Sequence, residues 1–241
     1  MSEPPPLPAA LAPRALPISH VFAWFQSAMR LFKLAPWTWC ALGVITLGVQ
    51  LVLEFIPGIG RAAAEVIMPV VECGLLVGAA ALDRGTELEL RCMLAPFRAP
   101  PGALAAIVVS SLIVSVVKFA VAYSLVGVNL LADPTDVRLT ADVLAAVIGA
   151  ATLASLPFAF VPFAALFQRE GFLRAFAVSF SGFALNAAPL IVFGVISLVL
   201  IAVGLLAWLL PLAAIFPLLA AANYAAWKDI YTPRLETLTA C

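Results

Sequence analysis

The chain alternates between long apolar stretches and short polar ones. Six of the apolar stretches are close to the roughly 20 residues that a helix needs to cross the hydrocarbon core of a bilayer. A continuous apolar run of this length is typical of a membrane-spanning helix, whereas a half-buried strand would alternate with a period of two. The pattern predicts an all-α, polytopic transmembrane bundle of six spans, at about 37–57, 61–82, 103–131, 141–167, 190–207 and 208–227.

The six spans group into three pairs joined by short connections, which predicts three helical hairpins. Each hairpin is preceded by a shorter amphipathic stretch, and helices of this kind lie in the headgroup plane instead of crossing the bilayer. We therefore expect three interfacial helices, near 18–34, 86–99 and 168–188. Each contains or ends at an Ala-Pro step, which reflects either a degenerate triplication of one unit or chance in an apolar chain. The apolar face of the first comprises Ile18, Val21, Phe22, Phe25, Met29 and Phe32.

The composition agrees with a chain whose solvent is mostly lipid. Of the 241 residues, 64% are hydrophobic and 11% are charged, and the mean hydropathy is +1.12; soluble domains carry about 25% charged residues. Thirteen basic and thirteen acidic residues cancel, so the net charge indicates no nucleic-acid partner. We expect one membrane domain at 18–231, preceded by a disordered, proline-rich tail at 1–17 and followed by a short cytoplasmic tail at 232–241.

The distribution of basic residues predicts the orientation in the membrane, because short loops rich in Lys and Arg face the cytoplasm. Only Arg61 and Arg138 are expected on the side opposite the termini. Both termini should therefore be cytoplasmic, with the interfacial helices on the anionic inner leaflet. The terminal side carries ten basic residues: Arg14, Arg30, Lys33, Arg84, Arg91, Arg98, Arg169, Arg174, Lys228 and Arg234.

Three charged residues within the spans are the candidate site. A charge at membrane depth costs about 3 kcal/mol on insertion scales and normally faces the interior of the bundle. Glu72 and Lys118 lie near the middle of spans two and three, so we expect them to form an ion pair. Glu65 lies seven residues before Glu72, on the same helix face. The three residues form either a polar track for a proton or a charged solute, or a static ion pair that fixes helix packing.

Span two also carries Gly74 and Gly78, which form a GxxxG step. Two glycines at this spacing leave a shallow groove along one helix face, into which another element can pack closely. In a chain this rich in alanine, we expect the step to serve packing within the molecule.

Sequence motifs for catalysis are missing. His20 is the single histidine, so no second histidine can complete a metal site, and the cysteines have no spacing typical of zinc. Neither a GxSxG nor an HExxH motif occurs, and there is no phosphate-binding or dinucleotide-binding loop. We therefore expect no catalysis, no cofactor and no metal.

Five segments carry a family resemblance: RLFKLAPWTW, PGIG, GLLVGAAALDRG, QREGFLRAFAVSF and AAWKDIY. Through them the chain resembles an uncharacterised proteobacterial family of six-helix inner-membrane proteins, which is distantly similar to the membrane domains attached to some glycerophosphodiester phosphodiesterases. The resemblance covers about Val21 to Tyr231. It implies six spans and a place in the bacterial inner membrane, but no activity, because the family has no assigned biochemistry.

Two functions are compatible with these features. The first is a non-catalytic protein that organises or assists other membrane components, or interacts with the lipid surface through its interfacial helices. Its partners would be membrane lipids or an unidentified membrane protein. The alternative is a small secondary transporter or channel that uses Glu65, Glu72 and Lys118.

Overall fold

The computed structural model describes residues 12–56, 59–207 and 210–231, and all regular structure in these ranges is helical. The predicted all-α fold is confirmed for this part of the chain. The α-helices are α1 (His20–Leu34), α2 (Pro36–Glu54), α3 (Gly60–Asp83), α4 (Pro101–Val126), α5 (Ala141–Ser155), α6 (Val161–Leu166), α7 (Phe172–Leu185), α8 (Ala187–Leu206) and α9 (Leu212–Tyr231). Short 3₁₀ helices form η2 (Leu90–Leu94), η3 (Pro96–Arg98) and η4 (Leu156–Phe158).

Five stretches of the described chain are long and apolar enough to cross a membrane: α2, α3, α4, the combined α5–η4–α6 stretch and α8. They match the first five predicted spans to within five residues. The sixth predicted span corresponds to α9, which is not among them because Asn223, Lys228 and Asp229 make its second half polar. The chain thus has the make-up of a multi-pass helical membrane protein, while six spans in three hairpins stay a prediction.

The C-terminal end of α4 differs from the prediction. The apolar sequence runs on to Leu131, but the helix ends at Val126 because Gly127 adopts a left-handed conformation with φ 69°. The amide of Gly127 donates to the carbonyl of Tyr123 at 2.8 Å, which satisfies one of the last helical acceptors. The true helix is therefore shorter than predicted span three, and its midpoint lies nearer the N-terminus.

The second predicted interfacial helix, at 86–99, is instead a pair of 3₁₀ turns, η2 and η3. Pro96 and Pro100 remove backbone donors and restrict the residues before them, which prevents a continuous α-helix. The hydroxyl of Thr86 donates to the carbonyl of Ala81 at 2.7 Å and so satisfies an acceptor at the end of α3. The segment folds back over α3 and forms a wall of the pocket described below.

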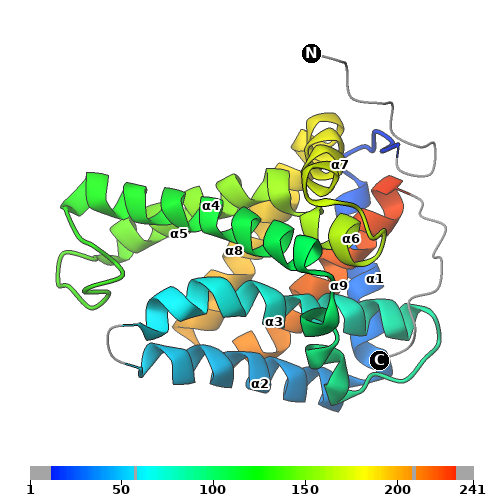
Figure 1. The fold of residues 1–241 in the computed structure, drawn as a ribbon, viewed down its shortest axis with the longest axis horizontal. Helices are drawn as coiled ribbons and strands as arrows, with labels where there is room; N and C mark the ends of the chain where they lie inside the picture. The colour runs from blue at the N-terminus through cyan, green and yellow to red at the C-terminus, as the bar shows by residue number, and fades with distance from the viewer. Residues whose placement is uncertain (1–11, 57–58, 208–209, 232–241) are drawn as a thin grey trace.

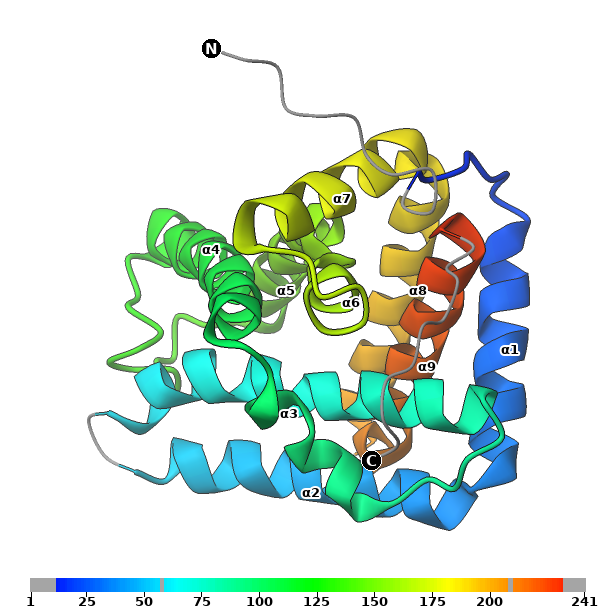
Figure 2. The same cartoon turned by 45° about the vertical axis from the view of Figure 1, so that its right-hand side comes forward.

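The long helices are arranged side by side in antiparallel pairs. In Figure 1, α2 runs beside α3, and α4 runs beside α5 above them. The loop at 127–140 lies at the same end of the molecule as the end of α2 and the start of α3, whereas α1 and α7 lie toward the other end. Figure 2 shows α1, α9 and α8 next to one another, crossing α2 and α3 at a steep angle.

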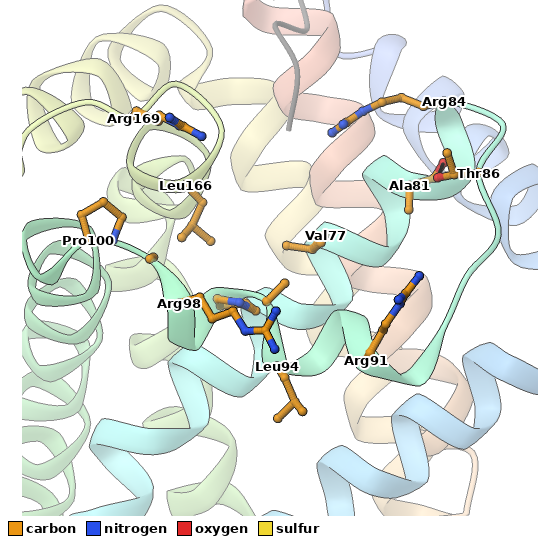
Figure 3. Close-up of a pocket in the computed structure, with 13 residues that line it drawn as sticks. Val77, Ala81, Arg84, Thr86, Arg91, Leu94, Arg98, Pro100, Leu166 and Arg169 are labelled. Carbon is orange, nitrogen blue, oxygen red and sulfur yellow. Dashed lines mark hydrogen bonds between the residues drawn. The ribbon is translucent and has the colours of Figure 1, made fainter. Parts of the chain in front are cut away.

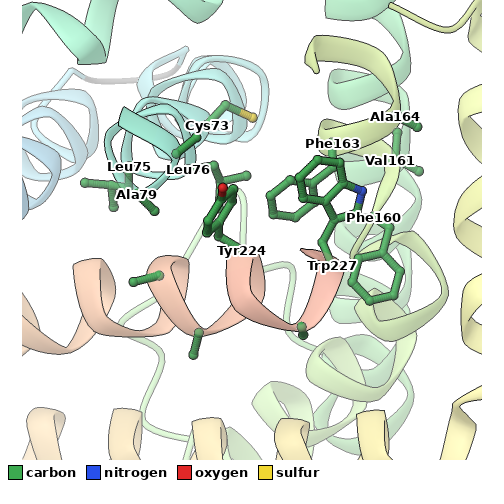
Figure 4. Close-up of a cluster of buried hydrophobic side chains, with 14 of the residues drawn as sticks. Cys73, Leu75, Leu76, Ala79, Phe160, Val161, Phe163, Ala164, Tyr224 and Trp227 are labelled. Atoms are coloured by element: carbon green, nitrogen blue, oxygen red, sulfur yellow. The ribbon is translucent and has the colours of Figure 1, made fainter. Parts of the chain in front are cut away.

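The hydrophobic core is centred on α9, which packs against α1, α2, α3 and α8. Trp227 of α9 stacks on Phe163 of α6 with ring centroids 5.0 Å apart and planes 10° apart (Figure 4). α2 comes so close to α9 that a Cβ on Gly43 would lie 1.8 Å from the carbonyl oxygen of Ala213. Close backbone approach through small residues is the usual way in which membrane helices gain packing energy.

Part of the predicted N-terminal tail is ordered. The amide of Arg14 donates to the carbonyl of Ile230 at 2.9 Å, and the amide of Leu16 donates to the side-chain oxygen of Asn186 at 2.8 Å. Residues 12–17 of the predicted tail are therefore attached to the helical bundle by hydrogen bonds, while disorder in the rest of the tail stays a prediction. Residues 1–11 of that tail, and the C-terminal tail at 232–241, lie outside the described residues.

Candidate functional site

The first part of the site is a closed ionic cluster between α3 and α4. The ammonium group of Lys118 forms an ion pair with the carboxylate of Glu65, and the hydroxyl of Ser115 donates to the same carboxylate. The ammonium also lies 4.8 Å from the ring centre of Phe119. Lys118 and Glu65 therefore neutralise each other and join α3 to α4.

The predicted ion pair between Glu72 and Lys118 is wrong, because Lys118 pairs with Glu65 instead. α3 and α4 are antiparallel, so a step of seven residues from Glu65 to Glu72 corresponds to a step of seven residues back from Lys118, to Ser111. Glu72 and Lys118 are thus two helical turns out of register. Part of the error arose because span three was expected to reach Leu131, which moved its midpoint about one helical turn toward Lys118.

Glu72 occupies a separate place, in a cavity of about 490 Å³ between α3, α4, α5, α8 and α9. Its side chain is exposed to this cavity, and it makes no hydrogen bond or ion pair with any residue that the structure describes. The cavity lining places Ser110 and Ser111 on α4 next to it, with Ser197 on α8 and Asn223 on α9. The structure thus divides the three predicted residues between two places, and only Glu72 faces open space.

Most of the polar side chains that line the cavity already donate a hydrogen bond to a backbone carbonyl. The hydroxyls of Ser110, Ser155 and Ser197 each donate to a carbonyl of their own helix, at 2.7–2.8 Å. The side-chain amide of Asn223 donates to the carbonyl of Ala159 at 3.4 Å, while its oxygen is buried and has no hydrogen-bond partner. The hydroxyl oxygens and the carboxylate of Glu72 can accept hydrogen bonds from a ligand, so the cavity favours a positively charged or donor-rich ligand.

An interrupted helix forms one wall of the cavity. The fourth predicted span breaks at η4, where Pro157 and Pro162 remove backbone donors. The hydroxyl of Ser179 on α7 stabilises the break, because it donates to the carbonyl of Pro157 at 2.7 Å and accepts from the amide of Phe160 at 3.1 Å. Irregular backbone at membrane depth is tolerated where protein groups satisfy it or where it lines a cavity.

The glycine step on α3 serves packing within the molecule. A Cβ on Gly74 would lie 2.6 Å from the Cα of Met93, and one on Gly78 would lie 2.7 Å from Leu88 and 3.4 Å from Trp39. The element that enters the groove is thus the segment before and within η2, together with a ring from α2. Gly74 and Gly78 allow this segment to pack closely against α3.

A second ionic cluster ties the N-terminal segment and α1 to the end of α9. The carboxylate of Asp229 is bonded to the ring nitrogen of His20 at 2.7 Å and to the indole nitrogen of Trp24 at 2.9 Å, and it forms an ion pair with Arg14. Partial burial by itself would raise the pKa of Asp229, but hydrogen bonds from these three side chains outweigh it and lower the pKa below its usual value. This cluster has the features of a structural clamp.

The described residues contain no group of three or more His, Cys, Asp or Glu side chains that could hold a metal ion. Sequence reasoning located Glu72 but missed the contributions of Asn223 and of the serines to the cavity. Comparison with models of protein families, with curated proteins and with solved structures finds no match. The fold and its apolar helices define the class, a multi-pass helical membrane protein, and the family resemblance stays a prediction.

Proposed function

We propose that this protein binds a small organic cation at Glu72 and carries it across the membrane, which is the transport alternative raised by the sequence. One observation carries the proposal: a carboxylate with no partner among the described residues, at the middle of a long apolar helix, faces a cavity whose hydroxyl groups offer acceptors. A charge in this position costs about 3 kcal/mol. A bound cation or proton would remove that cost.

The volume and lining of the cavity indicate the class of solute. A volume of about 490 Å³ lies within the range of about 300–1,000 Å³ that is usual for small-molecule sites. Leu75, Ile107 and Phe216 add apolar surface around the carboxylate. An amine or quaternary ammonium ion with a short hydrocarbon part would satisfy both kinds of surface, whereas a bare metal ion would leave most of the cavity empty.

The helices around the cavity also fit a carrier. The α5–η4–α6 stretch is interrupted at the cavity, and prolines lie within α3 at Pro69 and within α9 at Pro217. Discontinuous helices at the substrate site are a recurrent feature of secondary transporters. We propose the bacterial inner membrane as the location and a cytoplasmic position for both termini, on the basis of the basic residues counted above.

Binding and flux in proteoliposomes test this function. We expect at least one member of a series from methylammonium to tetraethylammonium to raise the melting temperature of the purified protein and to enter the liposomes. Glu72→Gln should reduce both effects more than 10-fold, because it removes the one charge that the described residues direct into the cavity. Asn223→Ala should reduce uptake several-fold.

Glu54→Gln is the matched control. Glu54 also belongs to a long apolar helix, at its end, but it is bonded to Gln50 at 2.8 Å and to Arg61 at 3.3 Å, outside the cavity. This variant should transport as the wild type does. If no ammonium ion binds, or if Glu72→Gln retains full uptake, the proposed function is wrong.

A specific feature of α1 favours the second function, contact with the lipid surface in a non-catalytic role. α1 buries Trp24 and Leu31 against the core and leaves Phe22 63% and Met29 42% exposed on its outer side. A Phe22→Trp variant in bilayers should be quenched most strongly by lipids brominated near the headgroup. Quenching by lipids brominated at the chain ends instead would exclude an interfacial position of α1.

A further inference from the structure

Four arginines line a pocket with a volume of about 740 Å³. They come from three separate segments: Arg84 follows α3, Arg91 and Arg98 belong to η2 and η3, and Arg169 lies between α6 and α7. Figure 3 shows the four side chains pointing into the space between these segments, with Arg84 and Arg169 reaching toward each other from opposite sides. All four belong to the basic side of the protein.

The described residues contribute no Asp or Glu to the lining, so the charges of Arg98 and Arg169 are not balanced within it. The guanidinium of Arg91 is paired with Glu89 at 2.6 Å, and Glu89 lies outside the lining. The exposed side chains of Arg98 and Arg169 have no hydrogen-bond or ion-pair partner among the described residues. Several positive charges around one space repel one another. An anion bound between them would be attracted to each and would offset this electrostatic repulsion.

The backbone around Arg169 holds this side chain in place at a conformational cost. Arg169 has φ 52°, in the left-handed region that residues other than glycine rarely adopt. The flanking amides fix the turn, because Gln168 donates to the carbonyl of Phe163 at 3.2 Å and Glu170 donates to that of Ala164 at 3.0 Å. Such strain persists where the surrounding structure determines it, and it is concentrated at functional positions.

The lining of the pocket is charged at the arginines and becomes apolar toward α3. Val77, Leu94 and Leu166 form an apolar part beside the guanidinium groups. A ligand that fits this lining has an anionic head and a short apolar portion. Arginine is the side chain best suited to phosphate, because its planar fork donates two parallel hydrogen bonds to one phosphate group.

We propose that the pocket between the end of α3, the η2–η3 segment and the α6–α7 turn binds a phosphate monoester or diester through Arg98 and Arg169, supported by Arg84 and Arg91. The ligand is either the headgroup of an anionic phospholipid or a soluble phosphate ester. The proposal does not depend on the Glu72 cavity, and it deepens the second function by giving contact with the lipid surface a defined binding site.

The test uses delipidated full-length protein in a neutral detergent. Three probes are titrated separately while the melting temperature is followed: phosphatidylglycerol, glycerol 3-phosphate and inorganic phosphate. We expect at least one of them to stabilise the wild type in a saturable way. Stabilisation by phosphatidylglycerol alone identifies a lipid headgroup, and stabilisation by glycerol 3-phosphate identifies a soluble ester.

Two single variants, Arg98→Gln and Arg169→Gln, should each weaken binding at least 10-fold. The matched control is Lys33→Gln, which removes one positive charge from an exposed position on the same side of the protein, outside the pocket. Arg98→Lys should restore part of the affinity, since it keeps the charge but loses the two parallel hydrogen bonds.

Three results would overturn the proposal: no probe stabilises the protein, the glutamine variants bind as the wild type does, or Lys33→Gln weakens binding as much as they do. The last would indicate a diffuse charge effect instead of a site. Gel filtration and the melting temperature without ligand confirm that each variant is folded. Ammonium uptake through the Glu72 cavity is measured independently, so failure of one proposal leaves the other intact.

Discussion

Glu65 and Glu72 share one face of α3, yet their surroundings differ completely. Glu65 is bonded to Ser115 and paired with Lys118 in the adjacent helix. Glu72, seven residues further along, faces a cavity and is bonded to none of the described residues. A carboxylate with a fixed partner contributes to packing, whereas a carboxylate facing open space retains its capacity to bind a ligand. We therefore propose that Glu65 is structural and that Glu72 is available for binding a ligand.

The largest stability effect should come from the paired carboxylate. Lys118→Met leaves Glu65 without its cation in an apolar environment, so it should destabilise the protein by about 2–3 kcal/mol. The double change with Glu65→Leu should recover most of this loss, because no charge then remains uncompensated. Denaturation in mild detergent, followed by tryptophan fluorescence, measures both changes.

Glu72→Gln provides the contrast in that experiment. It breaks no hydrogen bond or ion pair of the described structure, so it should leave stability unchanged or raise it by up to about 1 kcal/mol. If Glu72→Gln destabilised the protein as much as Lys118→Met does, Glu72 would have a structural partner and the comparison would fail.

Changes in the packing of η2 against α3 should affect stability nearly as much. Gly74→Ala places a Cβ 2.6 Å from the backbone of Met93, which must move, and this should cost about 2 kcal/mol. Gly48→Ala in α2 is the control: its Cβ would meet nothing within 4 Å, so the change should stabilise by about 0.5–1 kcal/mol. Equal effects of the two changes would mean that η2 is not held against α3.

Asp229 extends the comparison to a paired carboxylate outside the membrane-spanning helices. Its pKa is lowered in the folded state, so its contribution to stability is complete above the ordinary aspartate pKa of about 3.9 and is lost as the pH falls through the lowered value. Asp229→Asn should cost about 1 kcal/mol at neutral pH. The melting temperature of the variant should also depend less on pH between about 5 and 3. An unchanged pH profile would contradict the assigned partners.

The sequence predicted the helical class and five of the long helices well, since apolar length and prolines determine both. Prediction failed where a single residue or a distant contact decides the structure. Gly127 ends α4 within an apolar run, which the hydrophobic pattern does not reveal. The predicted partner of Lys118, Glu72, lies two helical turns from its true partner, Glu65. The ordered segment at 12–17 depends on Asp229 and Asn186, more than 160 residues away.

Of the candidate site, Glu72 was predicted from its charge and depth alone, whereas its surroundings were not. The hydroxyls and Asn223 come from helices whose rotation the hydrophobic pattern does not determine, because these helices are apolar on all sides. The arginine pocket was missed for a related reason. Its four members were recognised as basic residues on one side, but only the 3₁₀ turns and the strained turn at Arg169 bring them together.

The most direct test of the central claim is chemical labelling of the two carboxylates with dicyclohexylcarbodiimide, an apolar reagent that converts accessible carboxyl groups to N-acylureas. Trypsin releases Glu65 and Glu72 within the same peptide, so fragment ions give the modification at each site in one spectrum. We expect an adduct at Glu72, protection by an ammonium ion that binds, and no adduct at Glu65 until Lys118 is replaced by Met. Equal labelling of the two residues, or labelling of Glu65 alone, would contradict the division between a structural and a ligand-binding carboxylate.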